Sequence, residues 1–138
     1  MSFFRELLAT PSHVPTTSNY TAMNDALYLA AGALLVAWPG ATQVLFRDRA
    51  FVGDGQGFIR AMGLLVIVIS WLYLFGGRAG AQQIVAASVV DRLVFVPVVL
   101  MPLAASGVFP HLLVTFAILD PALALGACAL LARRPISP

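Results

Sequence analysis

The stretch SVVDRLVFVPVV, residues 88–99, places an aspartate and an arginine side by side in one of the most apolar parts of the chain. Asp91 and Arg92 belong to the residue types that are most costly in lipid, since a lone charge at the centre of a spanning helix costs about 2.5–3.5 kcal/mol on insertion scales. Charges at that depth must face one another or water. The stretch therefore predicts a membrane helix with a polar inner face.

The composition of the whole chain indicates the same environment. Hydrophobic residues make up 60% of the 138 residues and charged residues make up 10%, whereas soluble domains average about 45–50% and about 25%. A spanning helix needs about 20 mostly apolar residues, and the chain supplies four such segments. We therefore predict an all-α integral membrane protein, built as a four-helix transmembrane bundle.

The predicted transmembrane domain covers residues 25–138. The connections GGRAGAQQ and SGVFPH are short, so the helices that they join are expected to be antiparallel neighbours. The N-cap of the first helix is expected at Thr21, Asn24 or Asp25. The four spans are expected at about residues 25–46, 58–75, 81–107 and 110–132.

Residues 1–24 are expected to form a separate N-terminal segment. In FFRELLA, residues 3–9, the apolar side chains follow one helical stripe, which is the pattern of a short helix at a membrane interface. The apolar part is too short for a signal peptide and is interrupted by Arg5 and Glu6. We expect the first spanning helix to direct insertion instead.

The arginines favour a topology with both termini in the cytoplasm, because cytoplasmic loops carry an excess of basic residues. The expected location is the bacterial inner membrane, which the chain would cross several times. In this orientation the cytoplasmic arginines are Arg5, Arg78, Arg133 and Arg134, and those at the outer surface are Arg47, Arg49 and Arg60.

Three charged residues are expected at similar depth in the membrane. Asp91 and Arg92 lie roughly 15 Å from the start of the third span, and Asp120 lies about 18 Å from the cytoplasmic end of the fourth. The guanidinium of Arg92 matches a carboxylate bidentately, so Asp120 or Asp91 is expected as its partner, and a contact with Asp120 is geometrically easy. The long side chain of Arg60 could reach the surface or turn inward toward Asp120.

The same polar residues form the candidate ligand-binding site. Four interpretations remain open: structural ion pairs that fix the helix register, the polar part of a ligand pocket, a proton or ion path, and a contact with a partner protein. The candidate ligand-binding residues are Arg60, Tyr73, Asp91, Arg92 and Asp120.

The third span also contains Pro97 and Pro102. Each proline removes a backbone hydrogen bond, so a kinked or locally unwound helix is expected there.

Several kinds of chemistry lack the residues that they need. The chain has no lysine for a Schiff base, a single glutamate, and only two histidines, His13 and His111, at unmatched positions. A single cysteine excludes an internal disulfide, and no basic run indicates nucleic-acid binding. No metal site and no cofactor are expected, and no catalytic residue is indicated.

Four sequence patterns carry a family resemblance over residues 58–132: FIRAMGLL, WLYLFGG, SVVDRLVF and FAILDPALAL. In these the chain resembles the small four-helix bacterial membrane proteins grouped around DoxX and BphX. The resemblance implies a four-helix bundle and transfers only Arg60, Arg92 and Asp120 as family-like polar positions. Asp91 and the two prolines of the third span depart from that pattern, which leaves a shared ligand in doubt.

The predicted function is that of an accessory or assembly subunit of a larger membrane complex. Small residues in the first span, from Ala30 to Ala33, would allow another helix to approach closely. The expected partners are membrane lipids and either other membrane subunits or a second copy of the chain. The alternative is a protein or enzyme that binds a small hydrophobic molecule, such as a lipid, quinone or pigment, at the charged residues. A small transporter is a weaker option, because the sequence shows no internal repeat.

Overall fold

The computed structural model describes residue 9 and residues 11–132, and this part of the chain is helical without any strand. The prediction of an all-α fold is confirmed. The predicted interfacial helix at residues 3–9 falls almost entirely outside the described residues, as do the arginines at positions 133 and 134. The described elements are α2 (Thr16–Ala37), α3 (Ala41–Phe46), α4 (Gly55–Arg78), α5 (Gln82–Val90), η1 (Asp91–Phe95), α6 (Val96–Ala105) and α7 (Pro110–Ala132).

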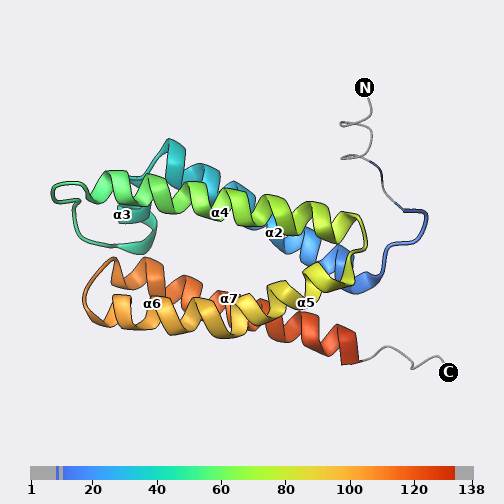
Figure 1. The fold of residues 1–138 in the computed structure, drawn as a ribbon. Coiled ribbons are helices and arrows are strands. Elements are labelled where there is room, and N and C mark those ends of the chain that lie inside the picture. The colour runs from blue at the N-terminus through green and yellow to red at the C-terminus, as the bar shows by residue number, and fades with distance from the viewer. Residues whose placement is uncertain (1–8, 10, 133–138) are drawn as a thin grey trace.

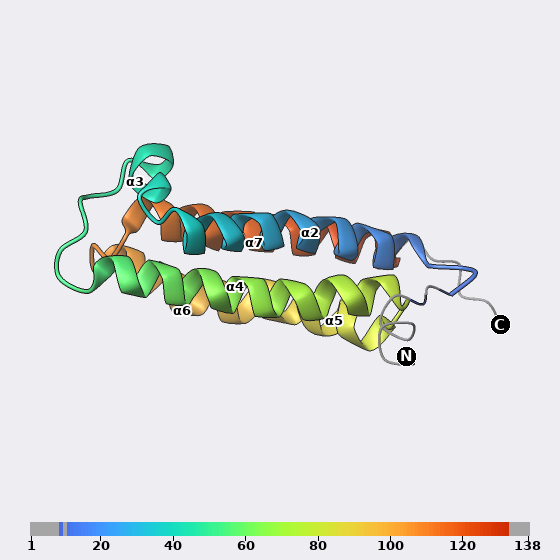
Figure 2. The same ribbon diagram turned by 90° about the horizontal axis from the view of Figure 1, so that it is seen from above.

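The helices lie in two layers (Figures 1 and 2). α2 packs along α4 in one layer, and α6 packs along α7 in the other, while α5 lies against both α4 and α7. α5, η1 and α6 follow one another without a break, so residues 82–105 form one long helix. Successive long helices run in opposite directions, as expected for short connections, and the start of α2 therefore lies at the same end as the finish of α7 (Figure 1).

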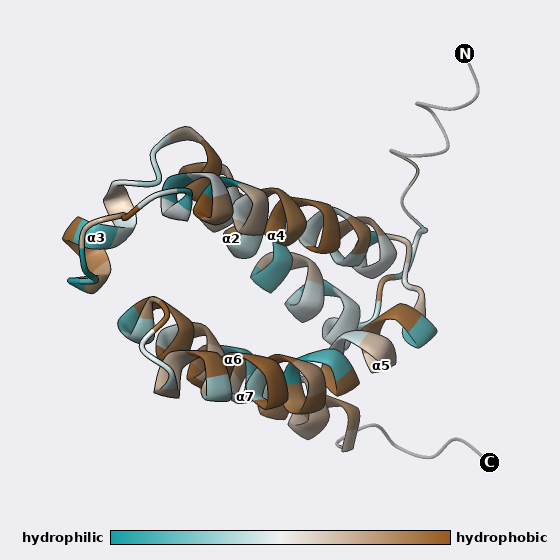
Figure 3. Ribbon diagram, turned by 60° about the vertical axis from the view of Figure 1, so that its left-hand side comes forward, coloured by the Kyte–Doolittle hydropathy of each residue, from teal (hydrophilic) through white to brown (hydrophobic). Residues whose placement is uncertain are grey.

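Among the described residues, three helices are long and apolar enough to cross a membrane: α4, the helix over residues 82–105, and α7. Large stretches of them carry hydrophobic residues (Figure 3). Their exposed side chains include large apolar ones such as Leu64, Val68, Val98 and Ile118. Because α2 has polar residues throughout its first half, it is not among the three, and a fourth span stays a prediction.

α2 differs from the predicted first span at both ends. It begins at Thr16 directly after Pro15 and ends at Ala37, because Pro39 has no N–H with which to continue the helix. The predicted boundary at residue 24 thus lies inside a helix. The predicted caps are instead internal and buried, together with Thr17 and Ser18: they are Thr21, Asn24 and Asp25.

Interhelical contacts explain why two of these polar residues, Ser18 and Asp25, are internal. The Ser18 hydroxyl oxygen accepts a hydrogen bond of 3.0 Å from the side-chain amide of Gln82, and Asp25 accepts one from Arg92. Residue types that favour helix caps can also form hydrogen bonds with side chains of a neighbouring helix, and the sequence pattern alone does not distinguish these two roles.

Glycines bring α2 and α4 close together. A Cβ atom added to Gly32 would lie 2.8 Å from the carbonyl oxygen of Gly63, and one added to Gly63 would lie 2.7 Å from the Cβ of Leu35. No larger residue fits at either position without a shift of the backbone. The small residues that we assigned to an external partner helix thus include Gly32, which packs within the chain instead.

The third long helix is distorted by a π-helical turn. In η1 the backbone N–H of Val96 bonds to the carbonyl of Asp91, five residues earlier. The turn ends directly before α6, in which Pro97 is the second residue. Since a proline ring clashes with the carbonyl four residues earlier, a wider turn makes room for it. The expected distortion is present, but as a wide turn in a continuous helix and upstream of both prolines.

Candidate functional site

Arg92 lies at the centre of a buried polar group formed by three long helices. Its Nη2 atom donates a hydrogen bond to Oδ1 of Asp25 on α2, and its Nε lies 3.5 Å from Oδ1 of Asp120 on α7. The expected contact between Arg92 and Asp120 is therefore present. The guanidinium carbon also lies 4.9 Å from the ring centre of Tyr28, within the range of a cation–π interaction. One side chain thus connects α2, η1 and α7.

Asp91 faces a different helix from its neighbour Arg92. Oδ2 of Asp91 accepts a hydrogen bond of 3.2 Å from the hydroxyl of Tyr73 on α4. A π-helical turn has more residues per turn than an α-helix, so adjacent side chains diverge by less than the usual 100° or so. Both side chains therefore face the same cavity, in which Asp91 contacts α4 and Arg92 contacts α2 and α7. We call Asp25, Tyr28, Tyr73, Asp91, Arg92 and Asp120 the charged cluster.

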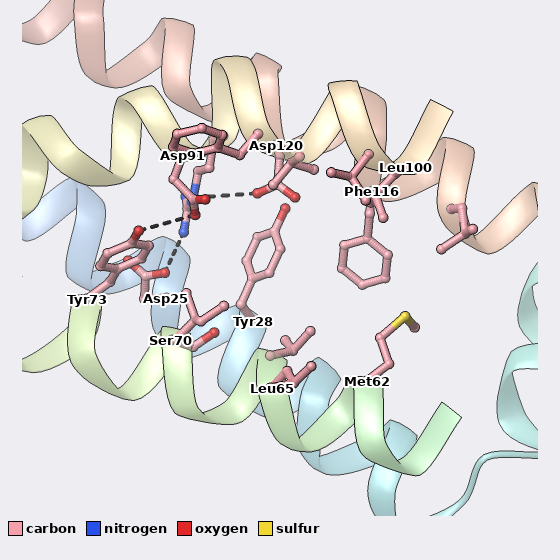
Figure 4. Close-up of a pocket in the computed structure, with 17 residues that line it drawn as sticks. Asp25, Tyr28, Met62, Leu65, Ser70, Tyr73, Asp91, Leu100, Phe116 and Asp120 are labelled. Carbon is pink, nitrogen blue, oxygen red and sulfur yellow. Dashed lines mark hydrogen bonds and ion pairs between the residues drawn. The ribbon is translucent and has the colours of Figure 1, made fainter. Parts of the chain in front are cut away.

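The charged cluster closes one end of a cavity of about 390 Å³ (Figure 4). Its volume falls in the range of about 300–1,000 Å³ that is usual for small-molecule sites. Ser70 joins the charged cluster in the lining at this polar end. The remaining lining is apolar and consists of Met62, Leu65, Val66, Ile69, Phe95, Val96, Val99, Leu100, Leu113 and Phe116.

The cavity opens sideways between α4 and α6. Its back wall is buried, since Tyr28 on α2 and Leu113 on α7 are only 7% and 3% exposed. Its front wall is not buried: Leu65 on α4 and Val99 on α6 are 62% and 54% exposed, and both line the cavity. The mouth thus lies along the sides of two of the three helices that are apolar enough to cross a membrane.

Four of the five predicted site residues line the cavity: Tyr73, Asp91, Arg92 and Asp120. The fifth, Arg60, is exposed near the start of α4 and is not part of the lining. It therefore does not turn inward to Asp120.

The prediction omitted Asp25 and Tyr28 as site residues. Asp25 was one of three expected helix caps, and Tyr28 was not among the candidate ligand-binding residues. Their spacing indicates one face of a helix, because Asp25, Tyr28, Gly32 and Leu35 recur at intervals of three or four residues. All four are buried.

Two polar atoms of the charged cluster are buried without a hydrogen-bond partner in the described part of the chain, Oδ2 of Asp25 and the hydroxyl of Tyr28. The hydroxyl of Tyr28 points toward Asp120 (Figure 4). Buried polar atoms without partners are costly, on the order of 1–3 kcal/mol each. The charged cluster therefore retains hydrogen-bonding capacity that faces a cavity.

A further buried carboxylate, Asp48, lies outside the charged cluster and has a structural role at the start of α7. Its Oδ1 accepts a hydrogen bond of 3.0 Å from the backbone N–H of His111, and its Oδ2 accepts one of 3.0 Å from that of Leu112. Oδ1 also lies 3.0 Å from Nδ1 of His111. These contacts cap the start of α7 from a distant loop, which the sequence did not predict.

No protein-family model, curated protein or solved structure matches the chain. The resemblance to the proteins grouped around DoxX and BphX thus stays a prediction. Among residue 9 and residues 11–132, no three histidine, cysteine, aspartate or glutamate side chains form a group that could hold a metal ion. The chemistry that the described residues support is hydrogen bonding and ion pairing at the end of an apolar cavity.

Proposed function

We propose that the protein is an integral membrane protein that binds a membrane-dissolved amphiphile in this cavity. The observation that carries the proposal is the sideways mouth between α4 and α6, which leads along apolar walls to the charged cluster. A molecule dissolved in lipid could enter without crossing water. Its apolar part would replace lipid contacts with protein contacts, and its head group would lie at the charged cluster.

The proposal includes α2 as a fourth span. Its 22 residues extend roughly 33 Å at about 1.5 Å per residue, which matches a hydrocarbon core of about 30 Å. Its polar residues are buried against other helices, and its exposed side chains include Met23, Leu27 and Leu34. Burial of the polar face inside the bundle supports insertion despite the moderate hydropathy of this helix.

The location in a bacterial inner membrane with both termini in the cytoplasm is part of the same proposal. Arg78 at the end of α4 lies at the end of the molecule where α2 begins, and Arg47 and Arg49 lie at the other end (Figure 1). Because cytoplasmic loops carry an excess of basic residues, the end with Arg78 and the start of α2 is assigned to the cytoplasm.

Tryptophan substitutions at the mouth test the binding proposal. Val99→Trp would fill the mouth, whereas Val98→Trp is a matched control, because Val98 is also exposed on α6 but does not line the cavity. Each protein is purified in mild detergent, and the bound amphiphiles are extracted and quantified by mass spectrometry. We expect the wild type and V98W to retain the same compound and V99W to lose most of it. Equal retention by all three proteins would contradict the proposal.

The function as an accessory or assembly subunit stays a prediction alongside this proposal. The same purification tests it, since other membrane proteins would then travel with the chain in constant ratio. Loss of such partners in V98W but not in V99W would favour the subunit function over the cavity.

A further inference from the structure

The charged cluster is unbalanced in charge. Asp25, Asp91 and Asp120 supply three carboxyl groups, and Arg92 is the one basic side chain that lines the cavity. The guanidinium is already engaged, because it bonds to Asp25 and lies against Asp120. An anionic head group would thus meet a surplus of like charge, whereas a cationic one would complement it.

The hydrogen-bonding capacity of the charged cluster points to the same kind of ligand. Asp25 is fully buried, lines the cavity, and its Oδ2 accepts no hydrogen bond in the described part of the chain. Asp91 receives one hydrogen bond, from Tyr73, through Oδ2. The free oxygen of Asp25 can therefore accept a hydrogen bond from a ligand in the cavity. An ammonium group carries three N–H donors and no acceptor, so it fits this site better than a hydroxyl does.

From these two features we propose that the amphiphile has a primary ammonium head, seated among the carboxylates of Asp25, Asp91 and Asp120, and a single apolar chain. The single chain follows from the cavity volume of about 390 Å³, which lies near the lower limit of the usual range for ligand sites. The chain would lie along the apolar lining between α4 and α6, toward Met62 and Phe116 (Figure 4). This inference rests on the proposed binding function and specifies its ligand class.

Three probes that differ only in the head group test the inference. Radiolabelled dodecylamine, dodecanol and dodecanoic acid are each bound at pH 7 to protein in a non-ionic detergent, and affinities are measured by equilibrium gel filtration. At this pH the amine is protonated and the acid is ionised. We expect dodecylamine to bind at least tenfold more tightly than dodecanol, and dodecanoic acid to bind more weakly than dodecanol. V99W measures the share of each probe that is held by the micelle alone.

Asp91→Asn removes one negative charge without breaking either of the two ion pairs of Arg92. We expect D91N to lower the affinity for dodecylamine at least fivefold and to leave that for dodecanol unchanged. Asp54→Asn is the matched control, because Asp54 is exposed and lies outside the cavity. It should change neither affinity. Should D91N fail to fold, the head-group ranking on the wild type decides the inference alone.

The outcomes separate this inference from the function on which it rests. Equal binding of all three probes, sensitive to V99W, would overturn the ammonium head and leave amphiphile binding intact. If dodecanoic acid binds more tightly than dodecylamine, the ammonium head is likewise overturned and amphiphile binding stays intact. Absence of V99W-sensitive binding for every probe would overturn both proposals. Methylamine serves as a fourth probe that has the ammonium head without the apolar chain, and binding equal to that of dodecylamine would overturn the apolar chain of the proposed ligand.

Discussion

Replacing Arg92 by leucine should strongly destabilise the protein. The substitution removes the hydrogen bond to Asp25, the contact of 3.5 Å with Asp120 and the cation–π contact with Tyr28. It also leaves three carboxyl groups together without a cation. Removing one partner of a buried ion pair typically costs about 3–5 kcal/mol, and we expect R92L to fall in this range.

Two further arginine substitutions make the expectation specific. Arg92→Lys keeps the charge, but one ammonium cannot reproduce the planar fork that reaches both α2 and α7. We expect it to cost about 1.5–3 kcal/mol, the contribution of one hydrogen bond to a charged group. Arg60→Leu is the matched control, because Arg60 is exposed and outside the charged cluster. It should change the free energy of unfolding by no more than about 0.5 kcal/mol.

The assay is unfolding in mixed micelles as the fraction of dodecyl sulfate rises, followed by circular dichroism and tryptophan fluorescence. Asp25→Asn in the R92L background should recover part of the lost stability, because it removes one of the carboxylates left without a cation. The reasoning is refuted if R92L and R60L unfold at the same dodecyl sulfate fraction. It is also refuted if R92K is as stable as the wild type.

Three other outcomes follow from particular contacts. Gly63→Leu should cost about 1–3 kcal/mol, because the larger side chain forces α2 away from α4. Gly57→Ala should be tolerated, because a Cβ there meets nothing within 4 Å. The unfolding assay above compares the two variants, and equal stability would contradict the close approach of α2 and α4. Asp48→Ala should lower the free energy of unfolding by about 1–2 kcal/mol, because two backbone N–H groups of α7 lose their acceptor. Hydrogen exchange of the amides in the first turn of α7 should become faster. Unchanged exchange would contradict the role of Asp48 as a cap of α7. In a cysteine-free background, an impermeant thiol reagent should label Ser106→Cys on whole bacterial cells and Ala79→Cys only after the cells are opened; the reverse pattern would invert the proposed topology.

The sequence predicted the features of the fold that depend on hydropathy and short connections. Long apolar stretches predicted α4, the helix over residues 82–105 and α7, and these are the three described helices that are apolar enough to cross a membrane. The cost of charge in lipid predicted that Arg92 and Asp120 would meet. These expectations follow from local composition and from depth along a helix, both of which can be counted along the chain.

The remaining features depend on contacts between distant residues. Asp25 is 67 residues from Arg92 in the chain, so local patterns favoured its interpretation as a helix cap. Asp48 bonds to the start of α7 from 63 residues away, which no spacing rule covers. Arg60 was included in the polar group because its long side chain could turn inward toward Asp120 and because the family resemblance transferred that position. The direction of its side chain around α4 places it outside that group.

The 67-residue separation between Asp25 and Arg92 also constrains biosynthesis. At about 5–20 residues per second, the ribosome completes Arg92 roughly 3–13 s after Asp25. During that interval Asp25 has no cationic partner, so transfer of this helix of moderate hydropathy from the translocon or the aqueous interface into lipid is unfavourable. In the proposed topology the first helix should thus be integrated late, together with the third, while α4 already anchors the shorter nascent chains, because it is apolar enough to cross a membrane by itself.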